Sequence, residues 1–192
     1  MQTIEAIARR RSIRKFRDQE LPEGSLMKIL EAATLAPSGK NAQPWRFVVV
    51  GRDRRAEMVS ILREGIQSFA DRFEEDVGSS GATARVMEQA PVTVFVFNPN
   101  GVHPWLTRSI DQSYHELVDV QSVGAAIENM LLAAQDMGLG SLWICDVFYA
   151  YSELLEWLGE SSQLVAAVSF GIPAESPEAR PRLSVDEVTR WL

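Results

Sequence analysis

Arginine side chains crowd the segment 9–17, which reads Arg-Arg-Arg-Ser-Ile-Arg-Lys-Phe-Arg. The first 17 residues carry six basic side chains and one acidic one, a net charge of +5, whereas the rest of the chain carries 13 basic and 25 acidic side chains. A guanidinium group donates a fork of hydrogen bonds that matches phosphate or carboxylate oxygens. The formal charge of −7 opposes a nucleic acid, because binding one requires many phosphates to be neutralised. The segment is therefore a candidate site for a small anion.

A purely structural role also fits these arginines. Ile4, Ile7 and Ala8 share one helical face behind Thr3, a plausible cap, which predicts a short helix that runs into the basic segment. Cations in the last turn of a helix interact favourably with its dipole. Taken alone, the segment favours this helix end over an anion site.

The loop 37–45, Pro-Ser-Gly-Lys-Asn-Ala-Gln-Pro-Trp, has the composition of a segment that supplies backbone N–H groups and short polar side chains to a ligand. A plain connection between a helix and a strand would explain its Pro, Ser and Gly. It would not explain why Asn41, Gln43 and Trp45 occur together. On the residues alone, both interpretations stand.

The elements that must position these residues alternate along the chain. Apolar residues at helical spacing predict helices at 26–33, 53–69, 120–137 and 154–158, and a capping box at 184–187 opens a last short helix. Runs of β-branched and aromatic residues predict strands at 47–50, 92–97, 141–145 and 164–170. Glycine and serine at 78–81 break the second helix. About four strands among six or so helices indicate one mixed α and β domain over residues 1–192.

Two of these segments are unusual. The helix 120–137 is apolar on nearly every face, so that it must be buried in the centre of the domain or in a subunit interface. The connection 98–113 is long for a segment without regular structure, as functional covers often are. Its His103 and Trp105 either contact a ligand or form a packed loop tip.

Several classes of protein are excluded by what the chain lacks. It contains no Gly-x-Gly-x-x-Gly after a strand, no P-loop and no Gly-x-Ser-x-Gly. Two histidines and one cysteine cannot build a metal site of the usual His/Cys kind, and Cys145 reads as a small buried apolar residue. The apolar runs are too short for a membrane span, and residues 1–8 do not resemble a signal peptide. We expect a cytoplasmic protein without metal, membrane or nucleic acid.

Four motifs, taken in order, carry a resemblance to a known family. Arg-Arg-Ser-Ile-Arg-x-Phe, Ala-Pro-Ser-Gly-x-Asn-x-Gln-Pro-Trp-x-Phe, Gly-Leu-Gly-x-x-Trp-Ile, and Gly-x-Pro with Arg-Pro-Arg occur at 10–16, 36–47, 138–144, and 171–173 with 180–182. In order and spacing the chain resembles the nitroreductase family of flavoproteins, over essentially its whole length.

The resemblance implies an α+β fold with a central, mostly antiparallel sheet of about four to five strands flanked by helices. It also implies an intertwined homodimer that holds FMN at the subunit interface. The residues that it places at the cofactor are Arg10, Arg11, Ser12, Arg14, Pro37, Ser38, Gly39, Asn41, Ile144, Cys145, Asp146, Arg180 and Arg182.

The resemblance also implies roles for these residues. Arg10, Arg180 and Arg182 look like ligands of the phosphate, and Ser12 like a ligand of the phosphate or the ribityl chain. Arg14 looks like the residue near flavin N1 and O2, where a positive charge stabilises the reduced anionic ring. The loop that contains Asn41 looks like the contribution of the second subunit.

This chain departs from the family at the strand end that passes flavin N5. The family often has Ile-Gly-Gly there, whereas this chain has Ile144, Cys145 and Asp146. The larger side chains must point away from the ring or reshape the substrate side, and a carboxylate near N5 would disfavour a reduced anionic flavin. The chain also ends soon after Arg182, so the C-terminal extension by which many members wrap the partner is expected to be short or absent.

The function that follows is an FMN-dependent oxidoreductase. Hydride would pass from NADH or NADPH through flavin N5 to a small-molecule acceptor such as a nitroaromatic or a quinone. The alternative is a protein of the same fold that stores, senses or consumes its flavin. A third interpretation is a mixed α and β domain whose arginines only cap helices.

Overall fold

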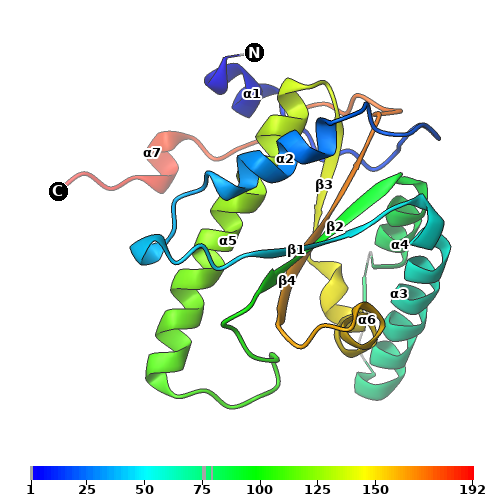
Figure 1. Ribbon diagram of the computed structural model, residues 1–192. Helices are drawn as coiled ribbons and strands as arrows, with labels where there is room; N and C mark the ends of the chain where they lie inside the picture. The colour runs from blue at the N-terminus through cyan, green and yellow to red at the C-terminus, as the bar shows by residue number, and fades with distance from the viewer. Residues whose placement is uncertain (1, 75–76, 79) are drawn as a thin grey trace.

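A four-stranded antiparallel sheet forms the centre of the molecule in a computed structural model that describes residues 2–74, 77–78 and 80–192 (Figure 1). The order is β1-β2-β4-β3, and each neighbouring pair is antiparallel. The inner strands are rich in valine and phenylalanine and are buried on both faces, as their composition predicts. This sheet confirms the predicted α+β fold. The strands are β1 (Arg46–Val50), β2 (Val92–Asn98), β3 (Gly140–Ile144) and β4 (Gln163–Gly171).

Helices cover both faces of the sheet (Figure 1). Successive residues of β2 alternate between two cores: Val94 and Val96 face one, while Phe95 and Phe97 face the other. The first core is completed by α2 (Ser25–Thr34) and α5 (Ile110–Asp136). The second is completed by α3 (Arg52–Phe73), α4 (Ser80–Gln89), the short helix η2 (Asp146–Ala150) and α6 (Tyr151–Leu158).

Two helices differ from the prediction. The helix α5 begins ten residues earlier than predicted, at Ile110, because Ser109 and Gln112 form a reciprocal capping box. The first turns of α5 leave the core, and Ile110 is 92% exposed, so these turns show no apolar periodicity. The helix α4 was not predicted, since its buried side is made partly of small residues such as Ala84. Of the predicted break at 78–81, residue 79 lies outside the described part of the chain.

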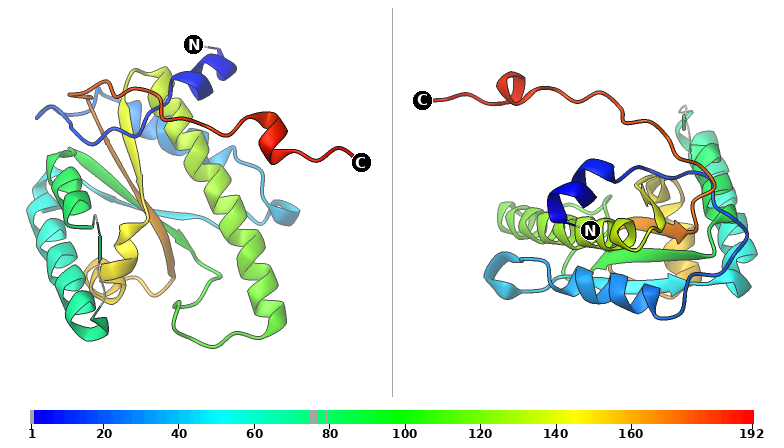
Figure 2. Two further views of the ribbon diagram at one scale, coloured as in Figure 1. Left: turned by 180° about the vertical axis from the view of Figure 1, so that it is seen from behind. Right: turned by 90° about the horizontal axis from the view of Figure 1, so that it is seen from above.

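Both ends of the chain leave apolar side chains uncovered. The predicted first helix is confirmed as α1 (Thr3–Arg9), although its N-cap is Gln2 and not Thr3. It buries Ala6, whereas Ile4 on the predicted apolar face is 77% exposed in the protomer. The last helix, α7 (Val185–Val188), has the predicted capping box, and the C-terminal segment around it extends away from the sheet and its helices (Figure 2). Trp191 in this segment is 83% exposed.

Gly65 allows α3 to approach η2 closely, which gives a first prediction. An alanine Cβ at this position would collide with the Cβ of Ala150 and lie 2.7 Å from its Cα. Overpacking of this kind costs about 1–3 kcal/mol, more than the roughly 1 kcal/mol that alanine gains over glycine in a helix. We expect Gly65→Ala to lower the free energy of unfolding, as measured by urea denaturation. Gly81→Ala is the control, because among the described residues its added Cβ would have no contact within 4 Å apart from its chain neighbours and the backbone of its own helix. Equal stability of the two variants would contradict this explanation.

Candidate functional site

The structure brings the two arginine motifs together. One hollow of about 160 Å³ is lined by residues from the beginning and the end of the chain. The two segments lie side by side, since the backbone N–H groups of Arg17 and Ala174 donate to the carbonyls of Ile172 and Lys15. Predicted phosphate ligands from both segments therefore line one hollow. The lining residues are Arg10, Arg11, Ser12 and Arg14 from the first segment, and Pro177, Glu178, Arg180 and Arg182 from the second.

Two glycines let the N-terminal segment lie against the sheet. The side chain of Ile13 would come within 2.9 Å of a Cβ on Gly140, and that of Phe16 within 2.7 Å of a Cβ on Gly171. Both apolar side chains are buried. The backbone N–H of Ile13 also donates to the carbonyl of Ser141 at 2.9 Å. The glycines and the arginine segment thus form one packed unit, which orients the neighbouring guanidinium groups.

The arginines divide by their partners. Arg9 pairs with Glu5 at 2.8 Å, and Arg11 donates to the carbonyls of Ala8 and Arg10 at 2.8 Å each, so both interact with α1 or its end. This agrees with the structural role considered for the segment.

The other arginines of the hollow have weaker interactions with carboxylates. Arg10 lies 3.6 Å from Glu128 of α5. Within the described residues, Arg14, Arg180 and Arg182 form no ion pair with a carboxylate. These three guanidinium groups are available to an anion.

Sequence reasoning missed two acidic residues beside this hollow. The carboxylate of Glu175 accepts the backbone N–H groups of Arg14 and Lys15 at 2.5 and 3.2 Å. Glu178 lines the hollow itself. The role of Glu175 depends on contacts with residues about 160 positions away in the sequence, which no local pattern indicates.

The loop that contains Ser38, Gly39 and Asn41 lies elsewhere on the protomer. The backbone N–H of Gly39 points to the hydroxyl of Ser122 at 3.4 Å, near the middle of α5, so the loop does not line the arginine hollow of its own chain. Lys40, Asn41 and Gln43 all have positive φ values, of 52°, 56° and 50°. Such conformations are costly for these residues and concentrate at functional sites. The contribution of this loop, Pro37 included, to a second subunit stays a prediction.

The residues that follow β3 do not share one environment. Ile144 is buried, Cys145 is exposed, and the carboxylate of Asp146 accepts a hydrogen bond from the hydroxyl of Thr83 in α4 at 2.5 Å. The prediction that Cys145 is a buried apolar residue is wrong for the protomer, because β3 is an edge strand whose end lacks a neighbour. Partial desolvation, and then the charge of Asp146, raise the pKa of the Cys145 thiol, which disfavours a reactive thiolate.

The strand β3 connects the arginine hollow with these residues. Ser12 forms an isolated bridge with Ser141 at the beginning of β3, and Cys145 follows its end. Five residues of a strand span about 16 Å. An elongated ligand with an anionic group at the hollow could therefore follow this edge, where Trp143 is 37% exposed.

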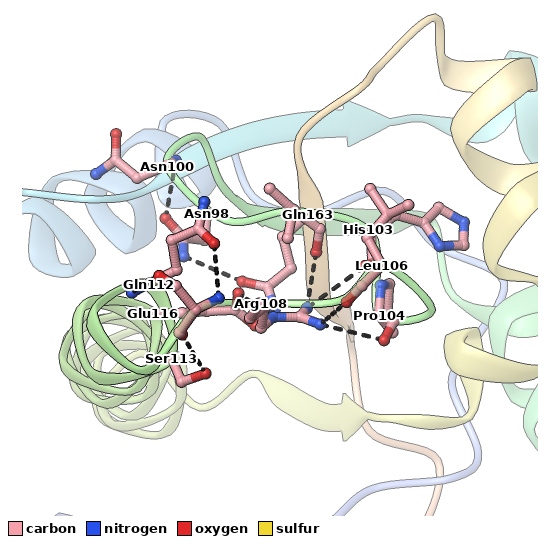
Figure 3. Close-up of polar contacts among 12 residues, drawn as sticks. Asn98, Asn100, His103, Pro104, Leu106, Arg108, Gln112, Ser113, Glu116 and Gln163 are labelled. Carbon is pink, nitrogen blue, oxygen red and sulfur yellow. Dashed lines mark hydrogen bonds and ion pairs between the residues drawn. The ribbon is translucent and has the colours of Figure 1, made fainter.

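A partly buried ion pair organises the connection between β2 and α5 (Figure 3). Arg108 pairs with Glu116 at 2.6 Å, each side chain being only 17% exposed, and it donates to four carbonyls of residues 102–106 at 2.8 to 3.5 Å. Glu116 also accepts a hydrogen bond from Gln163 of β4 at 2.6 Å. These hydrogen bonds fix the conformation of the connection over residues 99–109, which holds His103 and Trp105 against aromatic rings.

The ion pair gives a pH-dependent prediction. The hydrogen bond from Arg108, opposed by burial, lowers the pKa of Glu116 below its ordinary value of 4.5. A carboxyl whose pKa is lowered by folding stabilises the fold above its unfolded pKa, and this contribution is lost as the pH falls through the folded value. We expect Glu116→Gln to destabilise the protein at pH 7 and the deficit to shrink below about pH 4.5, in urea titrations at several pH values. The exposed Glu156→Gln is the control, and a deficit that does not depend on pH would contradict this origin.

Some expected absences remain predictions. Among the described residues, no group of three or more His, Cys, Asp or Glu side chains is placed to hold a metal ion. By length and composition alone, α5 could cross a membrane, and in this fold it packs on one face of the sheet. Cytoplasmic location and the absence of a nucleic-acid partner also stay predictions.

Fold and site together define an α+β protein with an arginine-lined anion hollow at the edge of an antiparallel sheet. Residues 7–172 match the model of the nitroreductase family, and the chain belongs to that family. A putative NADH dehydrogenase/NAD(P)H nitroreductase of Methanothermobacter thermautotrophicus is 31% identical, over 98% of this chain and 86% of the relative.

Two solved structures are also similar. A putative nitroreductase of Desulfovibrio desulfuricans in complex with FMN is 30% identical with a TM-score of 0.76, over 98% of this chain and 95% of that one. A BluB-like flavoprotein of Clostridium difficile is 26% identical, also with a TM-score of 0.76, over 100% of this chain and 99% of that one.

Proposed function

We propose that the protein is an FMN-dependent oxidoreductase that takes electrons from NADH or NADPH and passes them to a small-molecule acceptor such as a nitroaromatic or a quinone. The observation that carries the proposal is the hollow in which Arg14, Arg180 and Arg182 have no carboxylate partner among the residues that the structure describes. FMN, when bound, supplies the chemistry of hydride acceptance and electron delivery. The similar structure from Desulfovibrio desulfuricans, which contains FMN, supports this cofactor.

The residues present fit a phosphate group. Guanidinium groups and the Ser12 hydroxyl are the donors that phosphate oxygens require. Among the described lining residues they outnumber the one carboxylate, that of Glu178. We assign phosphate binding to Arg10, Arg180 and Arg182. Arg14 would place its positive charge at the ring, and the edge of β3 would run beside the rest of the cofactor.

We also propose that two copies of the chain form an intertwined homodimer. The helix α5 is apolar over most of its length, yet Tyr114 and Leu117 are 62% and 56% exposed. The C-terminal segment extends outward with exposed apolar residues, among them Leu183 and Trp191. A second copy that covers both surfaces would also bring its strained loop at 38–43 to the cofactor. The extent of this C-terminal exchange between subunits stays a prediction.

The visible spectrum of the purified protein tests the proposal. We expect the absorbance of bound flavin, and its bleaching in a stopped-flow experiment with NADH or NADPH under anaerobic conditions. Reoxidation by a quinone or a nitroaromatic would then complete the cycle. Bound flavin that neither nicotinamide reduces would refute the oxidoreductase.

A second candidate function is a protein that stores, senses or consumes its flavin. Asp146 favours it, because a carboxylate near the ring would disfavour a reduced anionic flavin, and the BluB-like structure shows that flavoproteins with another name share this fold. The hydrogen bond from Thr83 holds this carboxylate toward α4, which weakens the objection to the oxidoreductase. Persistent flavin without reduction by nicotinamide would favour this second function.

A further inference from the structure

A cavity of about 300 Å³ lies apart from the arginine hollow, between α3, the beginning of α6 and the connection 99–109. Trp105 stacks on Phe148 with a centroid distance of 5.1 Å and an interplanar angle of 15°. Phe69 packs edge-on against Tyr149 at 5.1 Å. Because the rings support one another, the wall is already formed without a ligand. The aromatic residues that line the cavity are Phe69, Phe73, Trp105, Phe148, Tyr149 and Tyr151.

The wall formed by the connection is fixed in place. Arg108 and Glu116 hold the backbone of this segment, and His103 turns from their network toward α6 (Figure 3). The ring of His103 packs edge-on against Tyr151 at 4.6 Å. Burial and the charge of Arg108 lower the pKa of His103 from 6.5, so this imidazole is uncharged at neutral pH.

Two opposite charges therefore remain in the lining, those of Arg72 and Glu153. The carboxylate of Glu153 lies beside Gly65, since its Oε2 is 3.1 Å from where a Cβ would be. Gly65 and Arg72 are seven residues apart on α3, about two turns on one face, or about 10 Å along the helix. The cavity thus has a carboxylate at one end, a guanidinium at the other, and aromatic rings between them.

Neither charge is neutralised within the described part of the chain. Neither the carboxylate of the half-buried Glu153 nor the guanidinium of Arg72 has a hydrogen bond or an ion pair there, and Arg72 instead lies over the ring of Phe73 at 5.3 Å. The half-buried carboxylate of Glu153 is partly desolvated, so an ammonium group that pairs with it restores an interaction lost on burial. The guanidinium of Arg72 is exposed, and it offers a carboxylate a fork of charge-assisted hydrogen bonds. An aromatic wall also favours a planar ligand, and it attracts a cation.

We propose that this cavity binds a planar aromatic molecule with an ammonium group at one end and a carboxylate at the other. The ammonium group contacts Glu153, the carboxylate contacts Arg72, and the ring packs against Trp105 and Phe148. This site does not depend on FMN and does not rest on the proposed oxidoreductase activity. It provides a second small-molecule site, which such a ligand can fill whether or not the flavin is reduced.

Isothermal titration calorimetry of the purified full chain tests the proposal with 4-(aminomethyl)benzoate, which is redox-inert. We expect this zwitterion to bind at least about tenfold more tightly than either benzoate or benzylamine, because each of these has only one charged group. This comparison uses the unmodified protein alone. No binding, or equal binding of the three compounds, would overturn the proposal.

Two variants locate the ends of the ligand. Glu153→Gln should weaken benzylamine and leave benzoate unchanged, whereas Arg72→Gln should do the reverse, and each should cost the zwitterion about tenfold. Glu156→Gln on α6 and Arg85→Gln on α4 are controls at exposed positions, and they should leave the affinity for all three compounds unchanged. Binding that both variants leave intact, with a shift of the flavin spectrum, would place the ligand at the flavin and overturn the assignment.

Discussion

Replacing Arg182 by alanine is expected to weaken FMN binding by about 10- to 100-fold, while the rate at which NADH reduces the bound flavin changes little. A hydrogen bond to a charged group contributes about 1.5–3 kcal/mol, which corresponds to this range. Arg182 lines the hollow together with the N-terminal arginines, and within the described part of the chain its Nη1 has only the carbonyls of Arg180 and Pro181 as acceptors, at 3.5 and 3.2 Å. A phosphate oxygen is a better acceptor for this group than a carbonyl is.

Fluorescence titration of the apoprotein with FMN measures the affinity, and stopped-flow absorbance measures the reduction. Arg190→Ala is the matched control, because this arginine is exposed on the same C-terminal segment but does not line the hollow. Wild-type affinity in Arg182→Ala would remove this residue from the phosphate site. A high salt concentration should reduce the difference in FMN affinity between the two variants, since exposed charges are screened.

How much of the site could be predicted depends on the range of the contacts involved. The pairing of the arginine motifs followed from the family resemblance, and the structure confirms that they lie together at one hollow. The second glycine of Gly-Leu-Gly has a physical reason that only the fold reveals, namely the approach of Ile13 to Gly140. Glu175, by contrast, is recognisable only through its contact with the backbone of Arg14.

The fold shows the same division between local and distant information. The four strands were predicted because β-branched and aromatic runs signal strands locally, and the capping box at 184–187 was predicted for a similar reason. The exposure of Cys145 was not predicted, because the sequence does not reveal that β3 lies at an edge of the sheet. The Arg108–Glu116 pair was also missed, since its partners are single charged residues without a motif.

Replacing Arg14 by alanine is expected to have the opposite effect to that of Arg182→Ala. We expect reduction of the flavin by NADH to slow by at least about tenfold, and FMN affinity to fall less than it does in Arg182→Ala. A positive charge near N1 and O2 stabilises the negative charge of the reduced ring, and charges about 4 Å apart near a protein surface interact by roughly 1–4 kcal/mol. Removing the charge should therefore lower the reduction potential of the bound flavin.

The structure makes Arg14 suitable for this test because its main chain and side chain act separately. Glu175 holds the backbone N–H of Arg14 at 2.5 Å, and buried Ile13 and Phe16 anchor the segment on either side, so an alanine at this position keeps the segment in place. Lys15→Ala is the matched control: its backbone N–H bonds the same carboxylate at 3.2 Å, but its side chain does not line the hollow. Redox titration with a dye of known potential measures the shift directly. If Arg14→Ala and Arg182→Ala lose affinity and reduction rate alike, the five arginines act as one undivided anion site, and the electrostatic role at the ring must belong to another residue.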